Sequence, residues 1–109
     1  MAARMDTLER LEQTIASRGA ADPDVSYVAK LNAKGLPKIS QKLGEEATEA
    51  VIAALSGSDE DLVGESADLL FHLLVLLNAK GIALADVLAE LDRREGVSGL
   101  EEKASRGDD

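Results

Sequence analysis

Four carboxylates arranged in two pairs are the residues of this chain best suited to chemistry. Glu46 and Glu49 form a Glu-x-x-Glu pair, and Glu65 and Asp68 form a Glu-x-x-Asp pair. Residues three apart share one face of a helix, so two packed helices would direct all four carboxylates at one spot. Like charges that close require a counter-charge, and Mg²⁺ prefers oxygen ligands and keeps waters for a phosphate substrate. The spacing therefore predicts a metal-dependent enzyme that acts on phosphates.

Two of these acids occupy positions on helix faces that are otherwise apolar. Glu46 fits the three-four spacing of one apolar stripe, and Glu65 fits that of another. The two stripes are Ile39, Leu43, Ala50 and Ala54, and Leu62, Leu69, Leu73 and Leu76. A buried carboxylate without a partner is costly, so an acid on each of two inward faces predicts a shared cation. We therefore expect Glu46, Glu49, Glu65 and Asp68 to bind metal rather than to be solvated surface acids.

The elements that must position these acids are expected to be helices, because no long stretch alternates apolar and polar residues. Helix ends recur instead: Gly19, Gly57 and Gly81 are suited to helix stops, and Ser58 is followed by three acids that favour a helix start. The expected helices span residues 6–18, 26–35, 37–56, 59–80 and 84–95. One domain over residues 1–109, with a core over 6–95 and a polar tail over 96–109, fits the length of 109 residues.

Composition restricts the partners. The net charge is −9 and the only aromatic residues are Tyr27 and Phe71, which argues against a nucleic-acid polymer as ligand. The chain has no cysteine, which excludes thiolate zinc and suits a reducing cytosol. The longest nearly apolar run, Leu69 to Leu77, is far shorter than the roughly 20 residues that span a bilayer, so we expect a soluble cytoplasmic protein without a membrane partner.

The same run predicts self-association. Leu69 to Leu77 is apolar on almost every side, and a helix of that kind needs burial all round. A chain of this length offers few layers to provide it, so we expect a homodimer or a larger homo-oligomer.

With these residues in view, the chain resembles the phosphoribosyl-ATP pyrophosphatase family of histidine biosynthesis, within the MazG-like all-α nucleotide pyrophosphatases. The superfamily pattern matches at Glu46, Glu49, Glu65 and Asp68. The more specific likeness lies in three stretches that together extend over roughly residues 6–95: SYVAKLNAKGLPKISQKLGEEATEAVIAA, ESADLLFHLLVLL and GIALADVLAELDRR. One departure is Phe71, where relatives often have a tyrosine.

The resemblance implies hydrolysis of phosphoribosyl-ATP to phosphoribosyl-AMP and pyrophosphate with Mg²⁺, for which Mn²⁺ can substitute. It also implies an all-α, MazG-like bundle of four to five helices, completed by oligomerisation, in the cytoplasm. Some relatives carry a fused cyclohydrolase that relies on cysteine-bound zinc. This chain has neither the length nor the cysteines for that domain, so it resembles the stand-alone enzyme.

Other charged residues have two readings each. Glu45 either acts in catalysis beside Glu46 and Glu49, as a general base or as a further member of the metal shell, or is an exposed helix acid. Lys34, Lys38 and Lys42 are either phosphate contacts, which would make them substrate-binding residues, or ordinary surface lysines with weak helix pairs.

Four more residues are open to two interpretations. Arg93 and Arg94 suit phosphate binding, but compensation of the helix dipole explains them more simply. His72, the only histidine, could orient Asp68 or touch phosphate, and a satisfied core or interface histidine is the favoured interpretation. Tyr27 is either a purine-stacking residue or part of the core.

Three rival functions remain to be weighed. A MazG-like enzyme that clears non-standard or excess nucleoside triphosphates would share the metal site and differ in the base pocket, and the family-specific stretches argue against it. A di-iron bundle needs Glu-x-x-His pairs on two helices, which one histidine cannot supply. A non-enzymatic helical interaction module would explain the apolar helix but not the inward acids.

Overall fold

The computed structural model describes residues 2–96, 99, 103 and 104, with side chains from residue 7 onward. Residues 2–96 form five helices and no strand, so the predicted all-α fold is confirmed. The helices are α1 (Ala2–Arg18), α2 (Tyr27–Lys34), α3 (Leu36–Ser56), α4 (Asp59–Ala79) and α5 (Leu84–Arg94). Most of the predicted tail over 96–109 lies outside the described residues.

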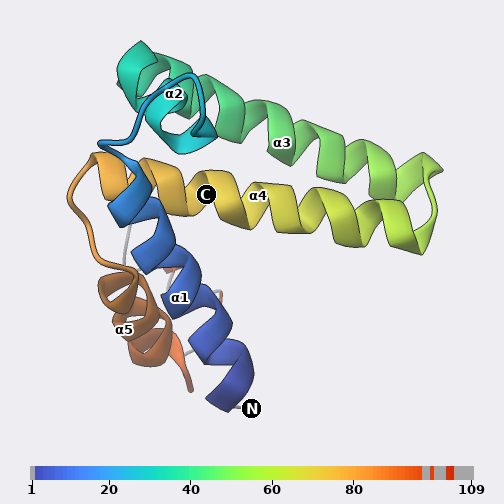
Figure 1. Cartoon of the computed structure of the whole chain (residues 1–109). Coiled ribbons are helices and arrows are strands. Elements are labelled where there is room, and N and C mark those ends of the chain that lie inside the picture. Colours follow the sequence, from blue (N-terminus) through green and yellow to red (C-terminus); the bar gives the residue numbers. More distant parts are fainter. Residues whose placement is uncertain (1, 97–98, 100–102, 105–109) are drawn as a thin grey trace.

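The helices form a hairpin with a second unit at one end. α3 and α4 lie side by side and antiparallel, and they share the most extensive contact in the chain (Figure 1). α2 packs on α3, and α1 packs on the part of α4 far from the α3–α4 turn. α1 and α5 extend away from the hairpin. The end of the hairpin that contains the α3–α4 turn therefore projects from the rest of the fold, and we call it the arm.

Side-chain caps set the helix starts as the sequence predicts. Ser58 precedes α4 and makes a reciprocal capping box with Asp61, and the first turn of α4 carries three acids. Ser26 caps α2 by accepting from the backbone N–H of Ala29 at 3.2 Å. α2 ends at Gly35, whose φ of 95° favours glycine, and Pro37 follows in the first turn of α3. α1 begins at Ala2, four residues before the predicted start.

The hydrophobic core lies where all five helices meet, away from the arm. Its buried members come from every helix: Ile15, Val28, Leu31, Ile39, Leu74, Val75 and Leu84. Leu74 and Val75 belong to the apolar run that the sequence analysis assigned to an oligomer interface. Contacts within the chain therefore bury these two residues, although Leu70 of the same run is 45% exposed.

The inward face of α3 differs slightly from the predicted stripe. Its buried residues are Ile39, Glu46 and Ala53, which are seven apart, whereas the predicted Ala54 is exposed. Seven residues make nearly two turns of 3.6 residues, so these three stack along the contact with α4. The inward phase of Glu46 is confirmed.

The arm is unusually apolar on its surface. Val51 and Leu55 of α3 are 57% and 83% exposed, and Val63 of α4 is 70% exposed. By length and composition alone, α4 could cross a membrane, which is weak evidence for a single helix. In this fold α4 packs against both α1 and α3.

Candidate active site

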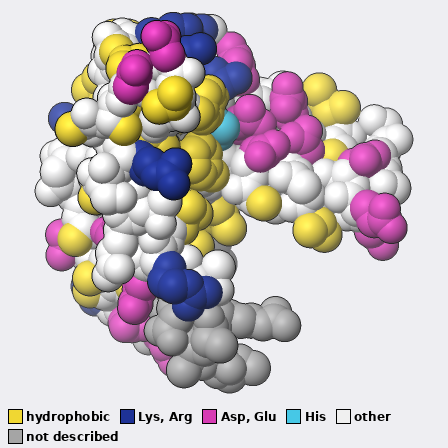
Figure 2. Space-filling model, viewed as in Figure 1, with side chains coloured by type: hydrophobic (Ala, Val, Ile, Leu, Met, Phe, Trp, Pro, Cys, Tyr) yellow, Lys and Arg dark blue, Asp and Glu magenta, His cyan; other side chains and the backbone are white. Residues whose placement is uncertain are grey.

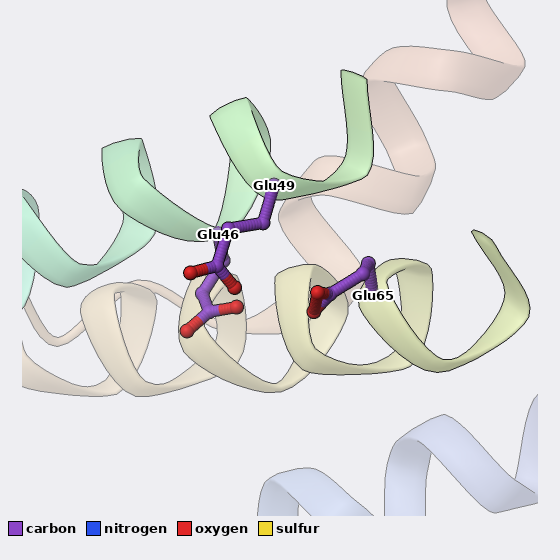
Figure 3. A group of neighbouring side chains, drawn as sticks. All are labelled: Glu46, Glu49 and Glu65. Atoms are coloured by element: carbon purple, nitrogen blue, oxygen red, sulfur yellow. The ribbon is translucent and has the colours of Figure 1, made fainter. Parts of the chain in front are cut away.

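Three carboxylates converge between the two helices of the arm. Glu46 and Glu49 come from α3 and Glu65 from α4, and one oxygen of each lies within 4.8 Å of the others. Figure 3 shows Glu46 and Glu49 projecting from α3 toward α4, where Glu65 approaches them from its own helix. We refer to these three residues as the carboxylate cluster. Figure 2 shows acidic side chains gathered on this part of the arm.

Glu46 is the most buried member of the carboxylate cluster, at 8% exposure. One of its oxygens, Oε1, lies 3.8 Å from the Lys42 ammonium. The other, Oε2, is buried and has no hydrogen-bond partner among the described residues. A buried carboxylate oxygen without a partner is costly, so a ligand that supplies positive charge would stabilise it.

The carboxylate cluster fits a hard divalent cation. All of its donors are carboxylate oxygens from two helices, which suits Mg²⁺ or Mn²⁺ and does not suit a thiolate metal. Glu46 Oε2, which is buried without a hydrogen-bond partner among the described residues, is one oxygen that such a cation could bind. The residues present therefore fit the metal that the sequence predicts.

Burial and like charges disfavour the ionised form of Glu65 in the carboxylate cluster. The pKa of Glu65 is raised, first by its burial and then by the negative charges of Glu49, Glu46 and Asp68. Both causes disfavour the ionised form. The carboxylate cluster is thus arranged at a cost in electrostatic free energy.

Asp68 lies at the margin of this arrangement. It is exposed and lies outside the group of oxygens within 4.8 Å, although its charge acts on Glu65. It lines the same cavity as Glu49 and Glu65. The structure therefore gathers three of the four predicted ligands and leaves the fourth beside them.

That cavity extends from the carboxylate cluster toward the turn of the arm. Its volume is about 590 Å³, and Glu60 and Asp61 line its far end. The basic side chains lie in the opposite direction along α3, where Lys42 precedes Glu46 by one turn. Positive charge beside the carboxylate cluster is therefore found on the Lys42 side, whereas acids line the cavity.

Lys42 is the predicted phosphate contact that lies nearest to the cluster. Its ammonium lies 3.3 Å from Glu45 and 3.8 Å from Glu46. Lys38 is half-buried, and its charge lowers the pKa of Glu45. Lys34 is exposed at the end of α2.

Glu45 itself is exposed and paired with neighbours. Hydrogen bonds from Gln41 and Lys42, in that order, lower its pKa. A lowered pKa makes a carboxylate a weaker base, which is unfavourable to the general-base interpretation.

Arg93 and Arg94 form a charge cluster of their own on α5. Both hydrogen-bond Glu90, Arg93 at 2.8 and 3.0 Å and Arg94 at 2.9 Å. Arg93 first, then Arg94, lowers the pKa of Glu90 to about 2. α5 packs near α1, away from the arm that carries the carboxylate cluster (Figure 1). Within one chain the structure does not bring these arginines to the acids.

Sequence reasoning missed a hydrogen bond between Tyr27 and His72. The two side chains lie 2.9 Å apart from Tyr27 Oη to His72 Nε2. His72 is buried at 6% exposure, so the interpretation as a satisfied core histidine is confirmed, whereas Tyr27 is 46% exposed and is not a core residue. No spacing signal links positions 45 residues apart; only the scarcity of aromatic residues hints at the pair.

The fold and the carboxylate cluster define a class. A helical hairpin that presents Glu-x-x-Glu opposite Glu-x-x-Asp is typical of the MazG-like all-α nucleotide pyrophosphatases. Comparison with known proteins gives the family within that class. A model of the family described as phosphoribosyl-ATP pyrophosphohydrolase matches residues 8–95. The chain belongs to this family.

Individual relatives match along nearly their whole length. The chain is 75% identical over 104 residues to the phosphoribosyl-ATP pyrophosphatase of Erythrobacter litoralis, covering 95% of this chain and 100% of the relative. It is 68% identical to the protein of that name from Rhizorhabdus wittichii, covering 92% and 94%. For Novosphingobium aromaticivorans the identity is 67%, covering 93% and 94%. The family resemblance stated from the sequence is confirmed.

Proposed function

We propose that this protein hydrolyses phosphoribosyl-ATP to phosphoribosyl-AMP and pyrophosphate, using Mg²⁺ or Mn²⁺. The substrate is the one for which its family and its relatives are named. The single observation that carries the proposal is the carboxylate cluster, in which a buried Glu46 oxygen has no partner among the described residues.

Glu46, Glu49 and Glu65 would hold the metal, with Asp68 joining from the edge of the cavity. Mg²⁺ held there would supply positive charge against the negative charge that develops on the leaving pyrophosphate. Asp68 is exposed, so its side chain has room to change rotamer and reach the site. Glu46 and Glu49 act in catalysis through this ligation, and Glu45 is the weaker candidate for a direct role.

Lys42 is the residue that we assign to a substrate phosphate. Its ammonium already lies beside Glu46, at 3.8 Å, and a lysine ammonium binds phosphate through charge-assisted hydrogen bonds. Lys38 and Lys34 would extend the basic surface along α3 and α2. Arg93 and Arg94 would reach substrate only through a second copy of the chain.

We further propose a cytoplasmic homodimer formed through the arm. The exposed apolar side chains Val51, Leu55 and Val63 support it, because covering such residues removes apolar surface from water. This places the interface on the arm, rather than on the whole run Leu69 to Leu77.

Product analysis tests the activity directly. Incubated with phosphoribosyl-ATP and Mg²⁺, the protein should release pyrophosphate and phosphoribosyl-AMP without orthophosphate, whereas ATP and deoxynucleoside triphosphates should be poor substrates. Exhaustive chelation should abolish turnover, and added Mg²⁺ or Mn²⁺ should restore it. Faster turnover of deoxynucleoside triphosphates would instead support the nucleotide-clearing alternative, and activity after chelation would refute the metal assignment.

A further inference from the structure

Three rings contributed by α2 and α4 form a group, which we call the aromatic cluster: Tyr27, Phe71 and His72. They are the only tyrosine, phenylalanine and histidine of the chain, which has no tryptophan. The rings of Tyr27 and Phe71 stack with 6.0 Å between centroids and 21° between planes. The His72 ring meets both of them edge-on, at 5.7 and 5.2 Å. All the aromatic surface that the protein can offer a ligand is therefore in one place.

Tyr27 is the member of the aromatic cluster that a ligand can reach. It is 46% exposed, whereas His72 is 6% exposed. Its hydroxyl oxygen lies 2.9 Å from His72 Nε2 in a hydrogen bond, and one face of its ring meets Phe71. These contacts hold the ring at its tip and on one side, so the opposite face is presented in a fixed orientation. A ring that is already ordered loses little freedom when a ligand binds to it.

One face of α4 connects the aromatic cluster with the carboxylate cluster. Glu65, Asp68 and His72 are spaced three and four residues apart, so they share this face. Glu65 and Asp68 line the cavity, and His72 holds the Tyr27 hydroxyl. From Glu65 to His72 the helix advances about 10 Å, a separation that an extended nucleotide can span. A nucleotide with its phosphates at the carboxylate cluster can therefore place its base at Tyr27.

The charges of the site favour this direction over the opposite one. Toward the turn of the arm the cavity is lined by Glu60 and Asp61, which repel phosphate, and that end has no aromatic residue. Toward α2, Lys42 follows one turn from Glu46 along α3, and α2 packs on α3. Positive charge and an exposed ring are thus found on the same side of the carboxylate cluster.

We propose that the adenine base of the substrate stacks on the exposed face of Tyr27. Every base has a π face, and aromatic side chains bind bases through it. This inference rests on the proposed function, in which an adenine nucleotide enters the site, and it adds where the base lies. The nucleotide would then extend along α4 from His72 toward Glu65.

Two substitutions separate the ring of Tyr27 from its hydroxyl. Tyr27→Leu and Tyr27→Phe both remove the hydrogen bond to His72, but only Tyr27→Leu removes the ring. We expect Tyr27→Leu to raise KM for phosphoribosyl-ATP by about tenfold or more, the range of one base stack. Tyr27→Phe should raise KM by less than about threefold, and kcat should change by less than about threefold in both. Equal rises in KM, or no rise in either variant, would overturn the proposal.

Val25→Ala is the matched control on the same surface. Val25 is 78% exposed and lies two residues before Tyr27, so this change removes exposed apolar surface without touching a ring. Its KM should equal that of the wild type. A rise as large as that of Tyr27→Leu would overturn the proposal, because it would show that any apolar loss at this surface has the same effect.

Fluorescence of the unaltered protein tests the stack without turnover. Because Tyr27 is the only tyrosine and there is no tryptophan, the emission comes from this ring. Phosphoribosyl-AMP, which carries the base, should quench it to saturation, whereas pyrophosphate with Mg²⁺ should not. No quenching by phosphoribosyl-AMP, or equal quenching by both, would overturn the stack even if phosphoribosyl-ATP is hydrolysed. Quenching by phosphoribosyl-AMP alone, without hydrolysis of phosphoribosyl-ATP, would support the stack and refute the proposed function.

Discussion

The two ends of the α3–α4 hairpin are built from the same two helices but have opposite character. At the end that meets α1, α2 and α5, most buried side chains are apolar, Val75 is fully buried, and the buried polar residues Ser26 and His72 have hydrogen-bond partners. Along the arm, the buried polar residue is Glu46, burial and then like charges raise the pKa of Glu65, and large apolar side chains are exposed. One end is organised for stability, and the other keeps charge and apolar surface available for ligands.

This difference indicates that packing elsewhere in the fold holds the carboxylate cluster together. Like charges in the carboxylate cluster repel, and they are kept together by the packing of α3 on α4 and by the core in which both helices are anchored. Stability and function should therefore respond in opposite directions to changes on the arm.

The largest expected effect is on activity. Glu46→Gln and Asp68→Asn should each lower turnover by at least about 100-fold, because each removes a carboxylate that would hold metal against developing phosphate charge. Without metal, Glu46→Gln should raise the melting temperature, since it relieves repulsion in the cluster. Steady-state kinetics and thermal melts without metal measure the two effects. Near-normal turnover of both variants with Mg²⁺ would contradict a role of these acids in metal binding.

The second largest effect is on stability, which should respond differently to substitutions at the two ends of the α3–α4 hairpin. Leu74→Ala should lower the free energy of unfolding by about 2–5 kcal/mol, because it leaves a cavity in the core. Leu55→Ala, at a residue that is 83% exposed, should change the folding free energy of the monomer by less than about 0.5 kcal/mol. Urea unfolding of both variants in a Val63→Asp background, where we expect the protein to be monomeric, gives the comparison. Similar costs for the two substitutions would contradict the difference between the two ends.

Self-association should depend on the arm and not on the core. Leu55→Asp and Val63→Asp should each weaken the dimer by about tenfold or more, since a charge would be buried at the interface. Sedimentation velocity at low micromolar concentration should show an assembly for the wild type and monomer for the variants. Ala33→Asp, at an exposed position of α2 away from the arm, is the control. A compact, active wild-type monomer would contradict the dimer.

The smallest expected effect is on the pH dependence of stability without metal. The raised pKa of Glu65 means that the folded state binds its proton more tightly, so stability should rise as pH falls from neutral toward that pKa. The pKa of Glu90 is lowered from 4.5 to about 2, so its contribution is present above 4.5 and is lost as pH falls toward 2. In melting curves recorded over this pH range, Glu65→Gln should remove only the rise in stability on going from neutral pH toward the pKa of Glu65. Glu90→Gln should remove only the loss of stability between pH 4.5 and about 2. Identical profiles for both variants would refute the assignment.

Much of the fold was predictable because helix signals are local. The starts at Ser26 and Ser58 and the stops at Gly35 and Gly57 agree with the structure to within about one residue, since caps depend on neighbouring backbone groups. The family resemblance supplied the fold type and the substrate expected of the enzyme. The inward phase of Glu46 also followed from the sequence, because the helical period fixes which residues share a face.

The sequence by itself determined the helices, their ends and the set of acids, all of which follow from local geometry and side-chain chemistry. Only the tertiary structure decided that Glu46, Glu49 and Glu65 converge while Asp68 lies at the edge. It also decided that Leu74 and Val75 are buried within the chain, and that Tyr27 meets His72. These outcomes depend on how far one helix slides and rotates against another, which is set by packing between residues far apart in the chain.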